Sequence, residues 1–404
     1  MKYKKVLIIT VVITSLFFIA FNILSYETNG GGTFTMNQLD QYVSEWLNIN
    51  NYNNHPESDG PPALKTHPWL TLRAIQLYEQ YNPPLERWQK IEIIRGSIEE
   101  DYDIEGTASG DILGLIARDA ELTDAIGDKV DQSGRCMNHF MDAKGNGIWP
   151  FASALKWATT DPKNLTRYDE AVRLLKDEKN TIGWRYLGHV LHLLQDMSVP
   201  AHVRADMHGG GDTYELELRE LNIVDYCNIV GNCNISNLGE PKAIDTTEPD
   251  EYFIQLAADT RNNFYSDNSF TFMLKSLPPN IVTCDEQYLC NSNVGNGKIY
   301  VADKNGWMNS LPKMPSALGG EKKYYKITDK VAASMFSYLG LQAIQYGAGL
   351  IKLFYNETKQ TCVPTNANCI YNTCSSETCY DGCSFVQGVR ACGLTIKGWG
   401  EVAP

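Results

Sequence analysis

The chain has 404 residues, of which 43% are hydrophobic, and its formal net charge is −13 at pH 7. This length and composition are typical of a globular protein with a sizeable buried core. The acidic balance argues against a protein that grips the phosphate backbone of nucleic acids by bulk positive charge. It leaves open a small metal site that binds phosphate.

The N-terminus has the pattern of an export signal. Three lysines, Lys2, Lys4 and Lys5, precede a 19-residue apolar run at 6–24. We therefore predict a cleaved secretion signal within residues 1–30 and a secreted or extracytoplasmic protein. The alternative is an uncleaved membrane anchor, because the run is long enough to span a bilayer and no clean small-x-small cleavage site follows it.

Helical periodicity dominates the rest of the chain. Apolar residues recur at steps of three and four over four stretches, 68–81, 85–101, 180–199 and 327–355, the last of which could form one helix or two. Alternating strand patterns are scarce. We expect a mostly α fold for residues 31–358, with helices packed around a polar centre. Within it, 216–326 is expected to be irregular, with helices broken by long loops.

Eleven cysteines favour an oxidising compartment. Cys227 and Cys233 form one close pair, and Cys284 and Cys290 form another. Six more lie in the tail, at positions 362, 369, 374, 379, 383 and 392. Zinc binding by the tail is the alternative, but the tail has no histidine and no C-x-x-C pair. We predict five disulfides with Cys136 left over, and a small disulfide-rich C-terminal appendage at 359–404.

One short stretch, "HLLQDMSVPAHVRADMHGGGDTYE" at 192–215, gathers many nitrogen and oxygen ligands. His192 and Asp196 are four residues apart, so both lie on one helix face, and His202 follows after Pro200. His208 precedes three glycines. Imidazole and carboxylate groups together form a zinc-type ligand set.

Several of these residues also have ordinary structural interpretations. Asp212 and Glu215, three residues apart, could be first-turn acids that the helix dipole favours. His189, three residues before His192, is expected to be a core residue or to support a ligand. The combination favours a metal, because a buried histidine and carboxylate in an apolar helix cost free energy unless metal or hydrogen bonds compensate.

Four motifs in order resemble one family. "LHLLQDMSVPAH" at 191–202 looks like the core motif of the zinc-dependent phospholipase C and S1/P1 nuclease superfamily. "THPWLTLRAI" at 66–75, "GSIEED" at 96–101 and "NHFMD" at 138–142 are similar to its other ligand-bearing segments. The resemblance spans about 67–215 and implies a multi-helix phospholipase C/P1 nuclease-like domain.

The resemblance also implies a site with two or three Zn²⁺ ions. Its first metal would use Asp101, His139, His192 and Asp196; its second would use His202, Glu215 and a residue between them; its third would use His67 and share Asp196. Asp101 would also be the catalytic residue that takes a proton from the attacking water, and Glu100 is the alternative to Asp101.

The chain departs from the family pattern at two points. Gly211 stands where the phospholipases have a histidine four residues before the glutamate, and Asp212 or His208 could replace it. Helical geometry favours Asp212. The family's third metal also binds a mature N-terminal Trp, whereas no Trp precedes Trp46 here.

The implied activity is phosphodiester hydrolysis. Export and the stretch "HVRADMH" favour a phospholipase C that acts on glycerophospholipids at a membrane surface. The first alternative is a single-strand S1/P1-type nuclease with a nucleic acid substrate. The second is a non-catalytic surface binding protein with a structural metal centre. Trp69, Tyr102 and Trp149 could line a base or choline pocket or belong to the core. No protein partner is inferred.

Overall fold

The computed structural model describes most of the central part of the chain. It covers residues 66–100, 137–148, 150–176, 181–206, 212–221, 223–230, 234–266, 278–304 and 325–358, together with four short strands at 34–35, 104–105, 383–386 and 389–392. These residues are mostly helical with few strands, which confirms the expected mostly α fold. The N-terminal segment 1–30 and most of the tail 359–404 lie outside them, so the predictions made there are not tested.

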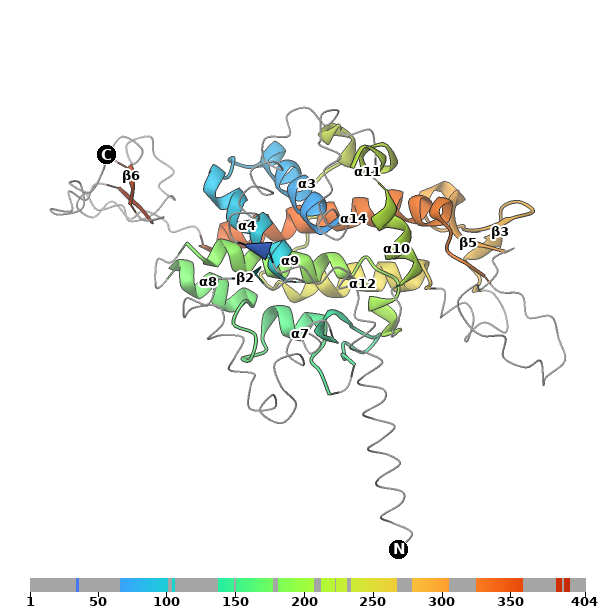
Figure 1. Cartoon of the computed structure of the whole chain (residues 1–404), viewed down its shortest axis with the longest axis horizontal. Coiled ribbons are helices and arrows are strands. Elements are labelled where there is room, and N and C mark those ends of the chain that lie inside the picture. The colour runs from blue at the N-terminus through green and yellow to red at the C-terminus, as the bar shows by residue number, and fades with distance from the viewer. Residues whose placement is uncertain are drawn as a thin grey trace, which may run out of the picture.

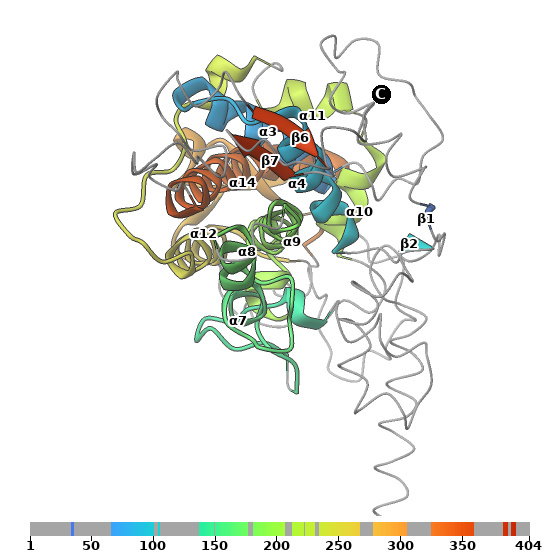
Figure 2. The same cartoon turned by 90° about the vertical axis from the view of Figure 1, so that its left-hand side faces the viewer.

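Helix α9 (Gly183–Asp196) lies at the centre of the fold. All of its residues except Arg185 are buried. Among the described helices it packs against α3 (Thr66–Tyr81), α4 (Arg87–Glu99), α7 (Ala154–Thr159), α8 (Tyr168–Lys176), α12 (Asp250–Asn263) and α14 (Asp329–Thr358) (Figures 1 and 2). Neighbouring helices therefore cover α9 on nearly every side. Its polar residues therefore point into the interior of the protein.

The four predicted helices are confirmed as α3, α4, α9 and α14. The last predicted stretch, 327–355, forms one continuous helix from Asp329 onward, the 30-residue α14, rather than two. Helices α3 and α14 pack together, and the ring of Trp69 lies 5.4 Å from that of Tyr226 and 6.0 Å from that of Phe336. Trp69 is fully buried, so it belongs to the core and not to a substrate pocket.

Shorter helices complete the described part of the domain: α10 (Thr213–Glu220), α11 (Ile223–Val230), α12 (Asp250–Asn263), and the 3₁₀ turns η6 (Met137–His139), η7 (His202–Arg204), η8 (Ile235–Leu238) and η9 (Gly295–Gly297). Turns η6 and η7 are joined by a backbone hydrogen bond from the Met141 N–H to the His202 carbonyl, 2.9 Å long. This bond holds the two histidine-bearing turns next to each other.

A small antiparallel sheet lies within 216–326, where the sequence analysis expected only helices and loops. Its strands are β3 (Ile281–Thr283), β4 (Tyr288–Asn291) and β5 (Ile299–Asp303), in the order β3-β4-β5. All residues of β4 are buried, so the strand lacks the alternation that would have revealed it. Cys284 and Cys290 form a disulfide, which is one of the five expected and whose partners the sequence left open.

Two further strand pairs are short. Strands β1 (Phe34–Thr35) and β2 (Ile104–Glu105) are parallel, whereas β6 (Cys383–Val386) and β7 (Val389–Cys392) form an antiparallel hairpin in the tail. In the part of the chain that the structure describes, no helix is both long enough and apolar enough to cross a membrane.

Candidate metal centre

Two glycines allow α4 and α9 to approach closely beside the predicted site. A Cβ atom on Gly96 would lie 1.9 Å from the carbonyl oxygen of Arg185, and one on Gly188 would lie 2.1 Å from that of Ile93. Any larger residue would therefore push the helices apart. This contact brings the Ser97 carbonyl oxygen within 2.8 Å of the His192 Nδ1.

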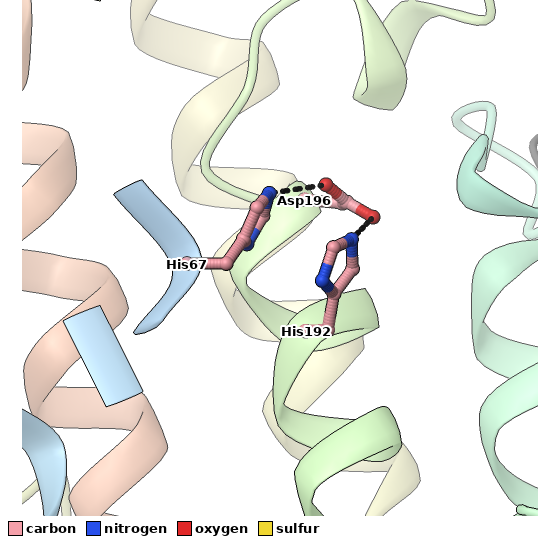
Figure 3. Close-up of side chains that lie close together, drawn as sticks. All are labelled: His67, His192 and Asp196. Carbon is pink, nitrogen blue, oxygen red and sulfur yellow. Dashed lines mark ion pairs between the residues drawn. The ribbon is translucent and has the colours of Figure 1, made fainter. Parts of the chain in front are cut away.

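The first group of candidate ligands consists of His67, His192 and Asp196. Figure 3 shows their side chains converging from α3 and α9. The Nε2 atoms of His67 and His192 each lie 3.7 Å from an oxygen of Asp196, and the two imidazole rings are stacked with centroids 3.7 Å apart. All three residues are buried. Their ligand atoms lie within 4.8 Å of one another, so they could hold a metal ion.

Hydrogen bonds fix the ring nitrogens that face Asp196. The His67 Nδ1 lies 2.9 Å from the Gln195 Oε1, and the Gln195 amide nitrogen donates to Thr71. The His192 Nδ1 lies 2.8 Å from the Ser97 carbonyl oxygen. Amide and carbonyl oxygens only accept, so both Nδ1 atoms carry the proton. Both Nε2 atoms are left with a lone pair, which is the arrangement that a metal-binding histidine requires.

The second group shares Asp196 with the first and adds His202 and Glu215. The His202 Nδ1 lies 3.7 Å from Asp196 and 3.2 Å from the His139 carbonyl oxygen, while its Nε2 lies 3.5 Å from the Glu215 Oε1. The Phe140 ring stacks on His202 with centroids 4.6 Å apart. Asp196 therefore stands between two groups of buried ligands.

His139 also joins the cluster, as the motif predicted. Its Nδ1 lies 2.9 Å from the Asp196 Oδ2, and its Nε2 lies 3.7 Å from the Glu100 Oε1. Glu100 follows the last residue of α4 and is only 2% exposed. Asp101 lies outside the described residues. The acid that the structure brings next to His139 is thus Glu100, the alternative named above.

The cluster shifts the acidity of its members. Burial alone would raise the pKa of the Asp196 carboxyl, but the nearby His139, His192 and His202 outweigh burial and lower it. Burial likewise opposes protonation of His202, yet the charges of Glu215 and Asp196 dominate and raise the His202 pKa to about 9. Without a metal, this centre thus favours the ionised carboxylate and the protonated imidazole.

Asp212, which the sequence favours as a further ligand of the second group, stands three residues before Glu215. It is 3% exposed and stands at the N-cap position of α10, but its side chain makes no capping hydrogen bond. His208 lies outside the described residues. The choice of Asp212 over His208 stays a prediction.

The donor atoms fit a divalent metal. Four buried histidines face Asp196, and the buried carboxylates of Glu100 and Glu215 lie beside His139 and His202. Imidazole nitrogen and carboxylate oxygen are the ligands that suit zinc and related ions. Burying so many ionisable groups together is costly unless they are paired or bind a metal.

Sequence reasoning missed the residues that orient the ligands. Gln195, Thr71 and the Ser97 carbonyl fix two imidazoles, but none belongs to a spacing pattern that predicts a ligand. The available signal was Gln195 itself, because a polar residue inside a strongly apolar helix needs a buried partner. Tyr102 and Trp149, which were considered as pocket residues, lie outside the described part of the chain.

No family model matches the chain, and no curated protein matches its sequence.

Proposed function

We propose that the protein is a zinc-dependent phosphodiester hydrolase of the phospholipase C type, which acts on glycerophospholipids. The observation that carries the proposal is the position of Asp196, whose carboxylate faces two groups of buried ligands at once. A structural zinc site is normally closed by four ligands of its own, whereas adjacent ions that share a ligand are typical of phosphoester hydrolysis.

The residues divide into two sets around Asp196. His67 and His192 would hold metal on one side, and His202 and Glu215 would hold it on the other, with His139 beside both. Bound zinc supplies Lewis-acid chemistry, because it makes water nucleophilic near neutral pH and neutralises charge on a phosphate. The hydrogen bonds made by the Nδ1–H groups of His67 and His192 keep their Nε2 atoms directed inward. The two imidazole rings would therefore need little reorientation to bind a metal.

Two acids that are adjacent in the sequence, Glu100 and Asp101, are proposed for metal binding and proton transfer. The Glu100 Oε2 lies 2.6 Å from the His189 Nδ1, so this carboxylate is already held by a hydrogen bond. Asp101 is the proposed catalytic base, which would remove a proton from the attacking water. Substituting Asp101 with Asn should then lower kcat more than it weakens substrate binding.

The test measures metal content and substrate together. Purified full-length protein is assayed on phosphatidylcholine, phosphatidylinositol and single-stranded DNA, before and after removal of metal by a chelator. We expect release of a phosphorylated head group, its loss after chelation, and its recovery with added zinc. Cleavage of single-stranded DNA with inert phospholipids would assign the protein to the nuclease alternative. Inactivity on every substrate with zinc fully bound would favour the non-catalytic surface protein.

A further inference from the structure

His189 lies directly behind the candidate metal centre and takes no part in either ligand group. It is 2% exposed and stands on α9 three residues before His192. Its Nδ1 lies 2.6 Å from the Glu100 Oε2, while the other oxygen of Glu100, Oε1, lies 3.7 Å from the His139 Nε2. The Glu100 carboxylate is therefore placed between two histidines, one of which contacts Asp196.

The opposite edge of the His189 ring faces a second carboxylate. Its Nε2 lies 3.5 Å from the Glu99 Oε2, and the Glu99 Oε1 lies 3.6 Å from the Arg185 Nη1. Arg185 also pairs with Glu92 at 2.7 Å, and Glu92 pairs with Arg95 at 2.8 Å. The two arginines balance the charges of Glu92 and Glu99. Glu99 thus has a cation of its own, and the short contact of His189 is with Glu100.

We propose that His189 is a positioning residue that holds the Oε2 of Glu100, so that Oε1 faces the metal centre beside His139. The inference rests on the metal centre of the proposed function. A 2.6 Å hydrogen bond to a carboxylate is short and charge-assisted, and it fixes the rotation of the carboxylate plane. Groups that hold a ligand in this way are worth roughly 10- to 100-fold in metal affinity.

Packing supports this role over that of an ordinary core histidine. His189 is joined to the end of α4 at the point where Gly96 and Gly188 bring α4 and α9 into contact. Glu100 immediately follows α4, so its backbone position is set by that contact and its carboxylate rotation by His189. A histidine that served only to fill the core would not need to direct one oxygen of an acid toward other ligands.

Three substitutions of His189 test whether its Nδ1 atom, rather than its Nε2 atom, makes the contact with Glu100 that supports zinc binding. The Asn side chain of His189→Asn presents its amide nitrogen near the place of Nδ1, whereas that of His189→Gln presents it near the place of Nε2. His189→Leu removes both. We expect the leucine variant to bind one zinc equivalent roughly 10- to 100-fold more weakly, the asparagine variant to recover most of this loss, and the glutamine variant to recover less. Zinc affinity is measured by competition with a chromogenic chelator on metal-free full-length protein.

A matched control separates positioning from stability. Leu187 is a fully buried residue on the same helix, and Leu187→Ala should lower the melting temperature without changing zinc affinity. If His189→Leu does not fold, the proposal is tested by comparing the zinc affinities of the asparagine and glutamine variants. Unchanged zinc affinity in the leucine variant, or equal affinities of the asparagine and glutamine variants, would overturn the proposal. Wild-type protein that binds no zinc would overturn it together with the proposed function. Zinc binding with the expected order of variants but no hydrolysis would overturn the catalytic function alone.

Discussion

Replacing Asp196 with Asn should empty more than one metal position. Asp196 belongs to both groups of candidate ligands, and its two oxygens face four histidines at 2.9 to 3.7 Å. Asparagine keeps the shape of the side chain and one oxygen but removes the negative charge. A single substitution should therefore weaken both groups at once.

The size of the effect follows from Coulomb's law. A unit charge at 3.7 Å, the separation of the Asp196 Oδ1 from the His67 Nε2, contributes about 4.5 kcal/mol at an effective dielectric constant near 20. Zinc binds carboxylate oxygens at about 2.0 to 2.2 Å and carries twice that charge, so the figure is a lower bound for the lost attraction. Since about 1.4 kcal/mol corresponds to a factor of ten, we expect zinc affinity to fall at least about 10³-fold in each group.

The assay compares metal stoichiometry in matched variants. Wild-type protein should bind two or three zinc equivalents by elemental analysis after dialysis, and Asp196→Asn should lose at least two of them. Asp161→Asn is the control, because Asp161 is also a buried aspartate but accepts a hydrogen bond from the Lys163 N–H in a turn. This control should keep the wild-type stoichiometry.

One result would refute the reasoning. If Asp196→Asn is folded and retains all the zinc of the wild type, Asp196 does not bridge the two groups, and the shared-carboxylate arrangement is wrong. Loss of a single equivalent would also count against bridging, because it would assign Asp196 to one group alone.

Three further predictions concern other parts of the protein. Glu215→Gln should remove about one zinc equivalent and leave the group of His67, His192 and Asp196 occupied, as measured by the same elemental analysis. In metal-free protein the His202 pKa is raised from 6.5 to about 9. Protonated His202 therefore stabilises the folded protein fully below pH 6.5, and this stabilisation is lost as the pH rises through 9. The free energy of unfolding in urea should fall by roughly 3 kcal/mol across that interval, and by less in Glu215→Gln. The six cysteines of 359–404 should form three disulfides, so alkylation without reduction should label no thiol in the tail.

Much of the helical fold could be predicted from the sequence because each main helix carries its own periodic signal. The pattern at 180–199 identified α9, and the pattern at 68–81 identified α3. The sheet at 281–303 gave no such signal, because its strands have three to five residues and the middle one is buried throughout. Short strands of this kind are specified by neighbours distant in sequence, which a local pattern does not contain.

The candidate site was predicted in composition but not in orientation. Spacing on one helix face correctly paired His192 with Asp196, and the motifs brought in His67 and His139. Spacing does not reveal which nitrogen of an imidazole faces the centre, since that depends on Gln195 and on the Ser97 carbonyl of another helix. For the same reason, only the family resemblance favoured Asp101 over its neighbour Glu100, whereas Glu100 is the acid that the described residues place beside His139.

The position of Asp196 in α9 explains why positive charge must gather around it. Asp196 is the last residue of a buried helix, where the carbonyl ends of the peptide dipoles disfavour an anion, and it is 1% exposed. Burial and the dipole both favour the neutral acid, yet the surrounding imidazoles lower its pKa. Without metal, the positive charge that stabilises the Asp196 carboxylate must come from protonated histidines, which agrees with the raised pKa of His202. A bound divalent ion would supply the same compensation, so metal binding must displace protons from the histidines and should become tighter as the pH rises.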